Sequence, residues 1–334
     1  MSMPATGPPA MALLAPDDGE FVRALMALDR LLVSVGLLVL LGGAGFVAIA
    51  QLEAAARMTR RLERRAWWLL GAAWCATTIG TLAGLLLYGP FTAGASFGRT
   101  LDAVPLDQTL QTRFGGIWGV RVLLLLILAL LWVWSEPEVQ RMRKGAWMAV
   151  GLLAAVLAVT PALSGHSGAR PDAAVGVVVG VLHFSAAAVW FGGLILLGAC
   201  VLPRADVGSL HSVLRFSSAA FTAMVVIVVT GTVQSWRQLG SLQALGETTY
   251  GHLLVAKVAA FLLLIAVAGR SRVLIRRRLM AMELVGAAPA RPSADADAGS
   301  LWLLRRLVLA EVAIAIVVLA VTALLGIATP PRAL

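Results

Sequence analysis

The sequence predicts an all-α fold, a polytopic membrane helical bundle of about eight transmembrane helices. Of its 334 residues, 60% are hydrophobic and 13% are charged, whereas soluble domains average about half apolar and about a quarter charged. The mean hydropathy is +0.89. Apolar runs of about 20 residues, the length that spans a bilayer as a helix, recur almost from end to end. A single membrane domain therefore accounts for the length of the chain.

The elements follow in order from these runs. Residues 1–30 contain Pro and Gly in "MSMPATGPPAMALL" and predict a flexible outer tail ahead of a single transmembrane domain, 31–334. Apolar runs at 31–50 and 67–88 predict the first two spans. Residues 89–115 lack such a run and predict an outer loop able to cover a pore mouth or meet a partner.

The remaining spans are predicted in the same way. Their apolar runs lie at 116–134, 146–163, 174–200, 215–238, 251–270 and 305–327. Most of the connections between them are short, as in an antiparallel bundle. The last one contains an Ala-, Pro- and Asp-rich stretch at about 283–300, which predicts a disordered inner linker.

The positive charge orients the chain. The net charge is +10, and most of the 27 Lys and Arg residues lie in alternate connections, beginning with five arginines between 57 and 65. Lys and Arg accumulate on the cytoplasmic side of membrane proteins, so both termini are expected outside. The basic surface is expected to contact anionic membrane lipid, and nucleic acid is not an expected partner.

Several function classes lack their sequence signatures. The two cysteines, Cys75 and Cys200, belong to no C-x-x-C pair and are not expected to form a disulfide. No phosphate-binding loop, H-E-x-x-H helix or G-x-S-x-G nucleophile elbow is present. ATP-driven pumping by this chain alone is therefore not expected, and neither is a hydrolytic enzyme.

The fifth span carries the first candidate metal ligand, His183 in "VLHFSAAAVWFGG". At helical spacing, His183 shares a stripe with Gly176, Gly180, Ala187 and Trp190. Small residues allow a neighbouring helix to approach closely, so this stripe is expected to face the bundle interior. An ionisable side chain at that depth indicates a function by default. The structural alternative is a histidine that only hydrogen-bonds a Ser or Thr of the next helix.

Other candidate ligands lie near the same predicted membrane face. His166, in "SGHSGA" between spans four and five, would reach His183 if its glycine-containing loop folds inward. His252, at the outer edge of span seven, could complete a three-histidine site. Imidazole suits copper and zinc, and thioether sulfur suits Cu(I). Met148 and Met224 are the membrane methionines available for such a route, although methionines at such positions are more often part of the core packing.

Three charged residues lie away from the ends of the predicted spans. Arg121 and Lys257 fall in the outer thirds of their spans, and Arg121 is expected to snorkel toward the headgroups. Glu311 falls in the inner third of the last span. An ion pair with Arg215, Arg305 or Arg306 is the favoured expectation for Glu311, ahead of a relay of protons or cations.

The motifs together resemble the copper resistance protein D (CopD) family of bacterial inner-membrane proteins. The resemblance rests on "GHSGA", "VLHFSAAAVWFGGLILL", "YGHLLVAKVAAFLLLIA" and "LRRLVLAEVAIAIVVLAVTALLG" in that order, and it is clearest over 160–334. It implies an eight-helix protein of the inner membrane that handles copper. It also implies His166 and His183 as copper contacts, and a separate periplasmic copper-binding partner (CopC-like).

The resulting hypothesis is a copper permease rather than an enzyme, importing Cu(I) or Cu(II) from the periplasm by way of His166 and His183. Two alternatives stay open. One is a membrane oxidoreductase that binds haem b, with His183 and His252 as axial ligands. The other is a factor that delivers copper for the assembly of an oxidase without transporting it.

Overall fold

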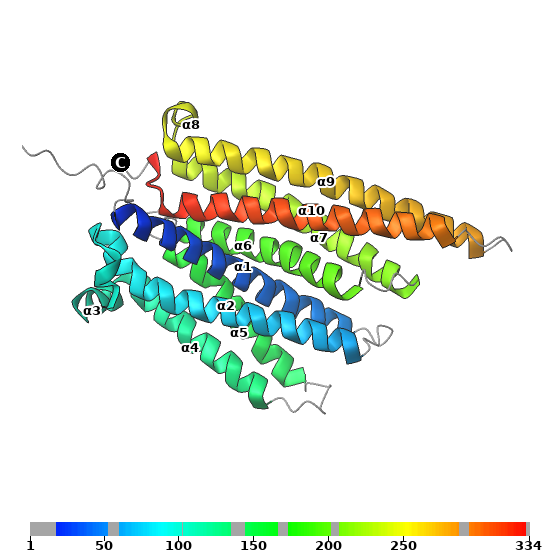
Figure 1. Ribbon diagram of the computed structural model, residues 1–334, viewed down its shortest axis with the longest axis horizontal. Coiled ribbons are helices and arrows are strands. Elements are labelled where there is room, and N and C mark those ends of the chain that lie inside the picture. The colour runs from blue at the N-terminus through cyan, green and yellow to red at the C-terminus, as the bar shows by residue number, and fades with distance from the viewer. Residues whose placement is uncertain are drawn as a thin grey trace, which may run out of the picture.

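The computed structural model describes residues 18–52, 60–101, 103–134, 144–165, 173–201, 207–286 and 294–331. These residues form helices and short turns, with no strand among them. The long helices run side by side along the length of the molecule (Figure 1), which is the arrangement expected of a membrane bundle. The all-α fold predicted from the sequence is confirmed.

The long helices match the predicted spans. They are α1 (Asp18–Leu52), α2 (Arg60–Ala93), α4 (Arg113–Trp134), α5 (Lys144–Ser164), α6 (Ala173–Leu196), α7 (Val207–Leu239), α9 (Thr249–Gly286) and α10 (Ala294–Ile327). By length and hydropathy, seven of the helices within the described residues can cross a membrane. The remaining predicted span, the fourth at 146–163, corresponds to a shorter apolar helix, Ala149–Ser164 within α5.

Helix α1 begins earlier than the sequence suggested. The predicted tail extended to residue 30, whereas α1 starts at Asp18. Val22, Met26 and Val33 are buried, at positions four and seven residues apart, and this spacing places them on one helix face. The prediction is therefore wrong for residues 18–30, because the apolar face of the first span continues into them.

Helices also replace much of the two long connections. The predicted loop 89–115 contains the end of α2, a short 3₁₀ helix (η2, Phe97–Leu101) and α3 (Ala103–Gln111). Gly94 ends α2 with a φ of 60°, a conformation that glycine adopts without strain. At the predicted linker 283–300, α9 extends to Gly286 and α10 begins at Ala294. Residues 287–293 lie outside the described part of the chain.

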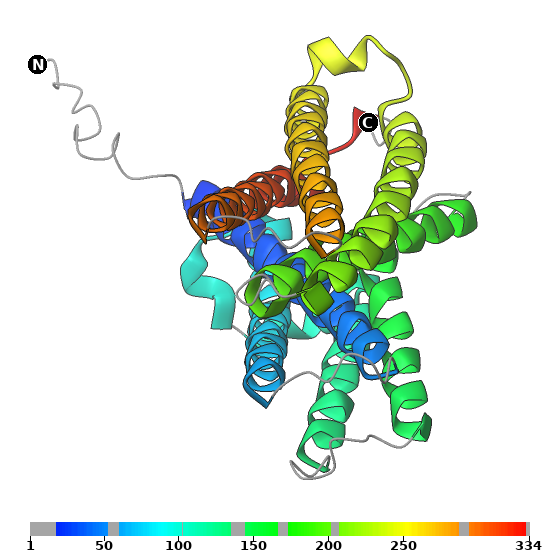
Figure 2. The same ribbon diagram turned by 90° about the vertical axis from the view of Figure 1, so that its right-hand side faces the viewer.

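Both α3 and the short helix α8 (Ala244–Glu247) lie at one end of the bundle (Figure 1). We call this end the α3/α8 end. Figure 2 looks along the bundle from the opposite end, where α1 lies among the other long helices. Helix α1 packs against α2, α6 and α10, while α6 packs against α5 and α7. Helix α1 is thus the structural link between the two halves of the chain.

Two glycines make the contact between α1 and α6 a backbone contact. A Cβ on Gly42 would lie 1.8 Å from the carbonyl oxygen of Ala188, and one on Gly192 would lie 2.4 Å from that of Leu38. No side chain fits at such distances, so the two helices cross with their backbones in van der Waals contact. A short π-helical segment (η4, Leu197–Val201) follows at the end of α6.

Candidate metal site

Helix α6 holds His183 inside the bundle. The residue lies ten positions after the start of the helix, or about 15 Å along it at 1.5 Å per residue. On the same stripe Gly176 and Trp190 are buried, and a Cβ on Gly180 would lie 2.9 Å from the Cβ of Ala162 in α5. The inward orientation of this stripe, predicted from its spacing, is confirmed by these contacts.

The ring of His183 packs against α7. Its Nδ1 lies 2.9 Å from the hydroxyl oxygen of Thr230, and its Cε1 would lie 3.4 Å from a Cβ placed on Gly231. The missing side chain of Gly231 therefore makes room for the edge of the ring. A nearby cation, Lys257 of α9, interacts electrostatically with His183. Helices α6, α7 and α9 together define the surroundings of this imidazole.

The hydrogen bonds of Thr230 indicate which ring nitrogen of His183 is free. The Thr230 hydroxyl donates its single proton to backbone carbonyl oxygens of its own helix, chiefly that of Val226. It can then only accept a hydrogen bond from His183, so the proton of the neutral ring is assigned to Nδ1. The ring also hydrogen-bonds the backbone of Ile227, in the same turn of α7 as Thr230, and within the described residues it has no further hydrogen-bond partner. The lone pair of Nε2 is therefore available to a metal ion, with Nδ1–H anchored as in known metal sites.

Of the other two candidate histidines, the structure describes His252 and does not bring it to His183. His252 is exposed near the start of α9, and its Nε2 lies 2.9 Å from the carbonyl oxygen of Gly246, in α8. This contact joins the start of α9 to α8 and stabilises the connection between them. His166 lies outside the described residues. Within the described residues, no three His, Cys, Asp or Glu side chains gather in a group that could hold a metal ion.

The remaining soft and aromatic candidates are packing residues where they are described. Met224 of α7 is half-buried against the main core, and Trp190 is buried with its ring centroid 6.4 Å from that of Phe191. Met148 lies in α5, and its side chain falls outside the described residues. Neither Cys75 nor Cys200 forms a disulfide within the described residues, as expected from the sequence.

One prediction about the charged residues is wrong. Arg121 does not snorkel: it is 2% exposed, and its Nε donates a hydrogen bond of 2.9 Å to the hydroxyl of Thr160 in α5. Glu311 is buried and accepts a hydrogen bond from Ser271 of α9. Of its predicted partners, Arg305 and Arg306 are exposed and the side chain of Arg215 lies outside the described residues, so the ion pair stays a prediction. Both polar groups have hydrogen-bond partners on adjacent helices. The separation of two residues along the chain does not reveal such a contact.

A second buried polar group escaped the sequence analysis altogether. Asp29 of α1 is 5% exposed, and it interacts electrostatically with Arg30 and Arg121. The signal was present in the sequence, because Asp29 continues the spacing of Val22 and Met26 on the buried face of α1. Assigning residues 1–30 to a tail concealed it.

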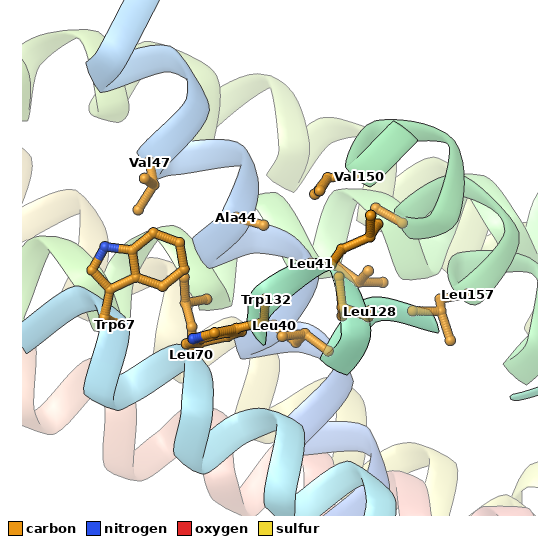
Figure 3. A pocket seen from close by; sticks show the side chains of 12 residues that line it. Leu40, Leu41, Ala44, Val47, Trp67, Leu70, Leu128, Trp132, Val150 and Leu157 are labelled. Carbon is orange, nitrogen blue, oxygen red and sulfur yellow. The ribbon is translucent and has the colours of Figure 1, made fainter. Parts of the chain in front are cut away.

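A pocket toward the opposite end of the bundle has a different character. It lies between α1, α2, α4 and α5, and Figure 3 shows that aliphatic side chains and the rings of Trp67 and Trp132 line it. No His, Cys, Met, Asp or Glu is among its lining residues. The pocket therefore offers nothing that would bind copper.

Comparisons with known proteins agree with the resemblance and extend it to the first half of the chain. A family model described as copper resistance protein D matches residues 210–325. Another, described as copper resistance protein D-like, N-terminal domain, matches residues 20–177. The second match starts inside the residues assigned to a tail from the sequence, in agreement with the early start of α1.

Two curated proteins are similar to the chain. Copper transport protein CutJ of Bacillus subtilis (strain 168) is 26% identical over 228 residues, which cover 66% of this chain and 42% of the relative. Copper resistance protein D of Pseudomonas syringae pv. tomato is 27% identical over 205 residues, which cover 58% of this chain and 64% of the relative. The chain thus matches less than two thirds of the length of either relative. No solved structure matches it significantly.

Proposed function

The chain belongs to the copper resistance protein D family, and from this premise we propose that it carries copper across the bacterial inner membrane, from the periplasm toward the cytoplasm. One observation supports the proposal most. His183 lies within the bundle with Nδ1–H bonded to Thr230 and the lone pair of Nε2 unused. Imidazole binds copper through such a nitrogen, so the ring can replace water around the ion as it enters the protein.

The proposed route starts at the α3/α8 end. His166 falls between the end of α5 at Ser164 and the start of α6 at Ala173, so its place in the chain suits a first contact. His183 is the next station, about 15 Å along α6. His252 lies at the same end and is proposed only as an accessory contact.

Lys257 gives the site a further property. A cation beside His183 raises the free energy of a second cation at Nε2 by Coulomb repulsion. Weak binding suits a transporter, because an ion must leave each site as well as enter it. We propose that Lys257 weakens the binding of copper at His183 and thereby favours its release from the site.

The proposed partners follow from the surface and from the family. The basic connections at the end opposite α3 and α8 suit anionic lipid headgroups. A separate periplasmic copper-binding protein (CopC-like) would deliver the ion at the α3/α8 end. Haem binding is not carried forward, because His252, the second proposed axial ligand, is exposed and bonded to Gly246.

Copper uptake into proteoliposomes tests this function. We expect the purified wild-type protein to accumulate copper, and His183→Ala to lose most of that uptake because the ligand in the route is gone. His252→Ala is the matched control, since it removes an exposed imidazole, and it should retain most of the uptake. Because no oxidase is present in the vesicles, uptake there also separates transport from a role in oxidase assembly. Unchanged uptake in His183→Ala would overturn the proposed site.

A further inference from the structure

The carboxyl group of Asp29 is buried without a hydrogen bond. Asp29 lies in the membrane-spanning part of α1, Gly19–Val47, and is 5% exposed. Neither Oδ1 nor Oδ2 has a partner within the described residues. A buried polar group without a partner costs about 1–3 kcal/mol, and a charged one costs more. Such a group requires an explanation.

Two glycines of α2 make room for this carboxyl group. A Cβ on Gly84 would lie 2.7 Å from Oδ2, and one on Gly80 would lie 3.3 Å from Oδ1. The ring of Trp118 of α4 covers the same place, because the Cβ on Gly84 would also lie 2.0 Å from that ring. Helices α1, α2 and α4 therefore enclose the carboxyl group, and the enclosure depends on α2 having no side chain at these positions.

Unpaired donors belong to residues that neighbour Asp29 in the chain or in the packing of the helices. Arg30 Nε, Trp118 Nε1 and Arg121 Nη1 are also buried without a hydrogen-bond partner. Both arginines interact electrostatically with Asp29, yet neither guanidinium hydrogen-bonds it. Arg121 instead uses Nε on Thr160 and lies with Cζ 4.8 Å from the centre of the Trp118 ring.

This arrangement differs from a structural ion pair. A buried Arg and Asp that stabilise a fold make direct hydrogen bonds, often two in parallel. Here the donors and acceptors remain without hydrogen-bond partners among the described residues, and water that bridges such groups would satisfy them. A carboxyl group held by water alone can gain or lose a proton without breaking a hydrogen bond to the protein.

We propose that Asp29 is a proton-binding site of this membrane protein, reached through water that bridges its carboxyl group to Arg121 and Trp118. The carboxylate takes a proton from hydronium and leaves a water molecule, and the reverse step returns the proton. The charged groups that face Asp29 are Arg30 on its own helix and Arg121 on α4.

A connection to copper follows from the packing of α1. Asp29 and His183 lie on the two helices that cross in backbone contact at Gly42 and Gly192. A change of α1 on protonation would therefore be transmitted to α6. This second part, exchange of protons against or along with copper, rests on the proposed function, whereas proton binding itself does not.

Infrared difference spectroscopy of the copper-free protein tests proton binding. We expect a carboxylic C=O stretching band that responds to pH, is lost in Asp29→Asn and is kept in Asp107→Asn. Asp107 is the matched control because it lies exposed on α3, hydrogen-bonded to Gln111. In the wild-type protein, ¹³C labelling of the aspartate carboxyl carbons should shift the band, which requires no substitution and excludes Glu311 as its source. A band that is unchanged in Asp29→Asn, or insensitive to the label, overturns the proposal.

The coupling is tested separately with a pH-sensitive dye trapped in proteoliposomes. We expect copper addition to change the internal pH in wild-type and Asp107→Asn vesicles, and the change to be lost in Asp29→Asn. A copper-driven pH change that persists in Asp29→Asn overturns the coupling. A wild-type protein that moves no copper contradicts the proposed function instead, and leaves the infrared result standing.

Discussion

Thr230 acts on His183 through its hydroxyl proton. Because that proton is donated to the helix backbone, the oxygen accepts from Nδ1–H and keeps Nε2 unprotonated. This hydrogen bond is also the structural alternative that the sequence left open, a histidine that only hydrogen-bonds a Ser or Thr of the next helix. The two interpretations are compatible, since ligand histidines in metal sites usually donate their other ring nitrogen to a neighbouring acceptor.

Replacing that hydroxyl tests the arrangement. Thr230→Val keeps the shape of the side chain and removes the acceptor, so the ring proton is free to move to Nε2. We expect copper affinity to fall by about tenfold, the lower end for loss of such a partner. Thr232→Val is the control, because its exposed hydroxyl bonds only to the carbonyl of Val228. Equal affinities in a copper titration of the two variants would show that Thr230 does not position His183.

Residue types and spacing were enough to predict some of the site and not the rest. The inward direction of His183 followed from Gly176 and Trp190 on the same stripe. The hydrogen-bond partner of His183, Thr230, could not be predicted in this way. The two residues are 47 positions apart in the chain, and only the packing of α6 against α7 brings them together. The prediction for Arg121 was wrong for the same reason, since its hydrogen-bond partner Thr160 belongs to another helix.

At the scale of the elements, the crossing of α1 and α6 fixes the distance between the two halves of the bundle. The apolar segments themselves were predictable, because about 20 consecutive apolar residues form a helix in a bilayer. Their ends were not: α1 continues back to Asp18, where charged residues alternate with the apolar ones that it buries. Which helices touch depends on glycines such as Gly42, and composition alone does not identify their partners.

A methyl group at the crossing should force the helices apart. In Gly42→Ala the added Cβ would lie 1.8 Å from the Ala188 carbonyl oxygen, and overpacking of this kind costs about 1–3 kcal/mol. We therefore expect a lower thermal unfolding temperature in detergent. Gly45→Ala on the same helix is the control, since nothing lies within 4 Å of its Cβ position. A Gly42→Ala protein as stable as Gly45→Ala would contradict the close crossing.

At the scale of the whole molecule, the orientation in the membrane decides where copper would enter under the proposed function. The bundle has a distinct α3/α8 end (Figure 1), and His252 lies there because its ring contacts Gly246 of α8. The clustering of Lys and Arg in the connections at the other end predicts that this other end faces the cytoplasm. The direction of import in the proposed function depends on this assignment, because the route begins at the α3/α8 end.

Cysteine labelling in intact cells tests the orientation. Cys75 and Cys200, the only native cysteines, are first replaced by serine, and single cysteines are then introduced as Asp107→Cys on α3 and Arg64→Cys near the start of α2. Both positions are exposed, so accessibility depends on the side of the membrane. With the outer membrane permeabilised, a membrane-impermeant maleimide should label position 107 and leave position 64 unlabelled until the cells are lysed. The reverse pattern would place the entrance near His183 on the cytoplasmic side, and copper entering from that end would then be exported by the same residues.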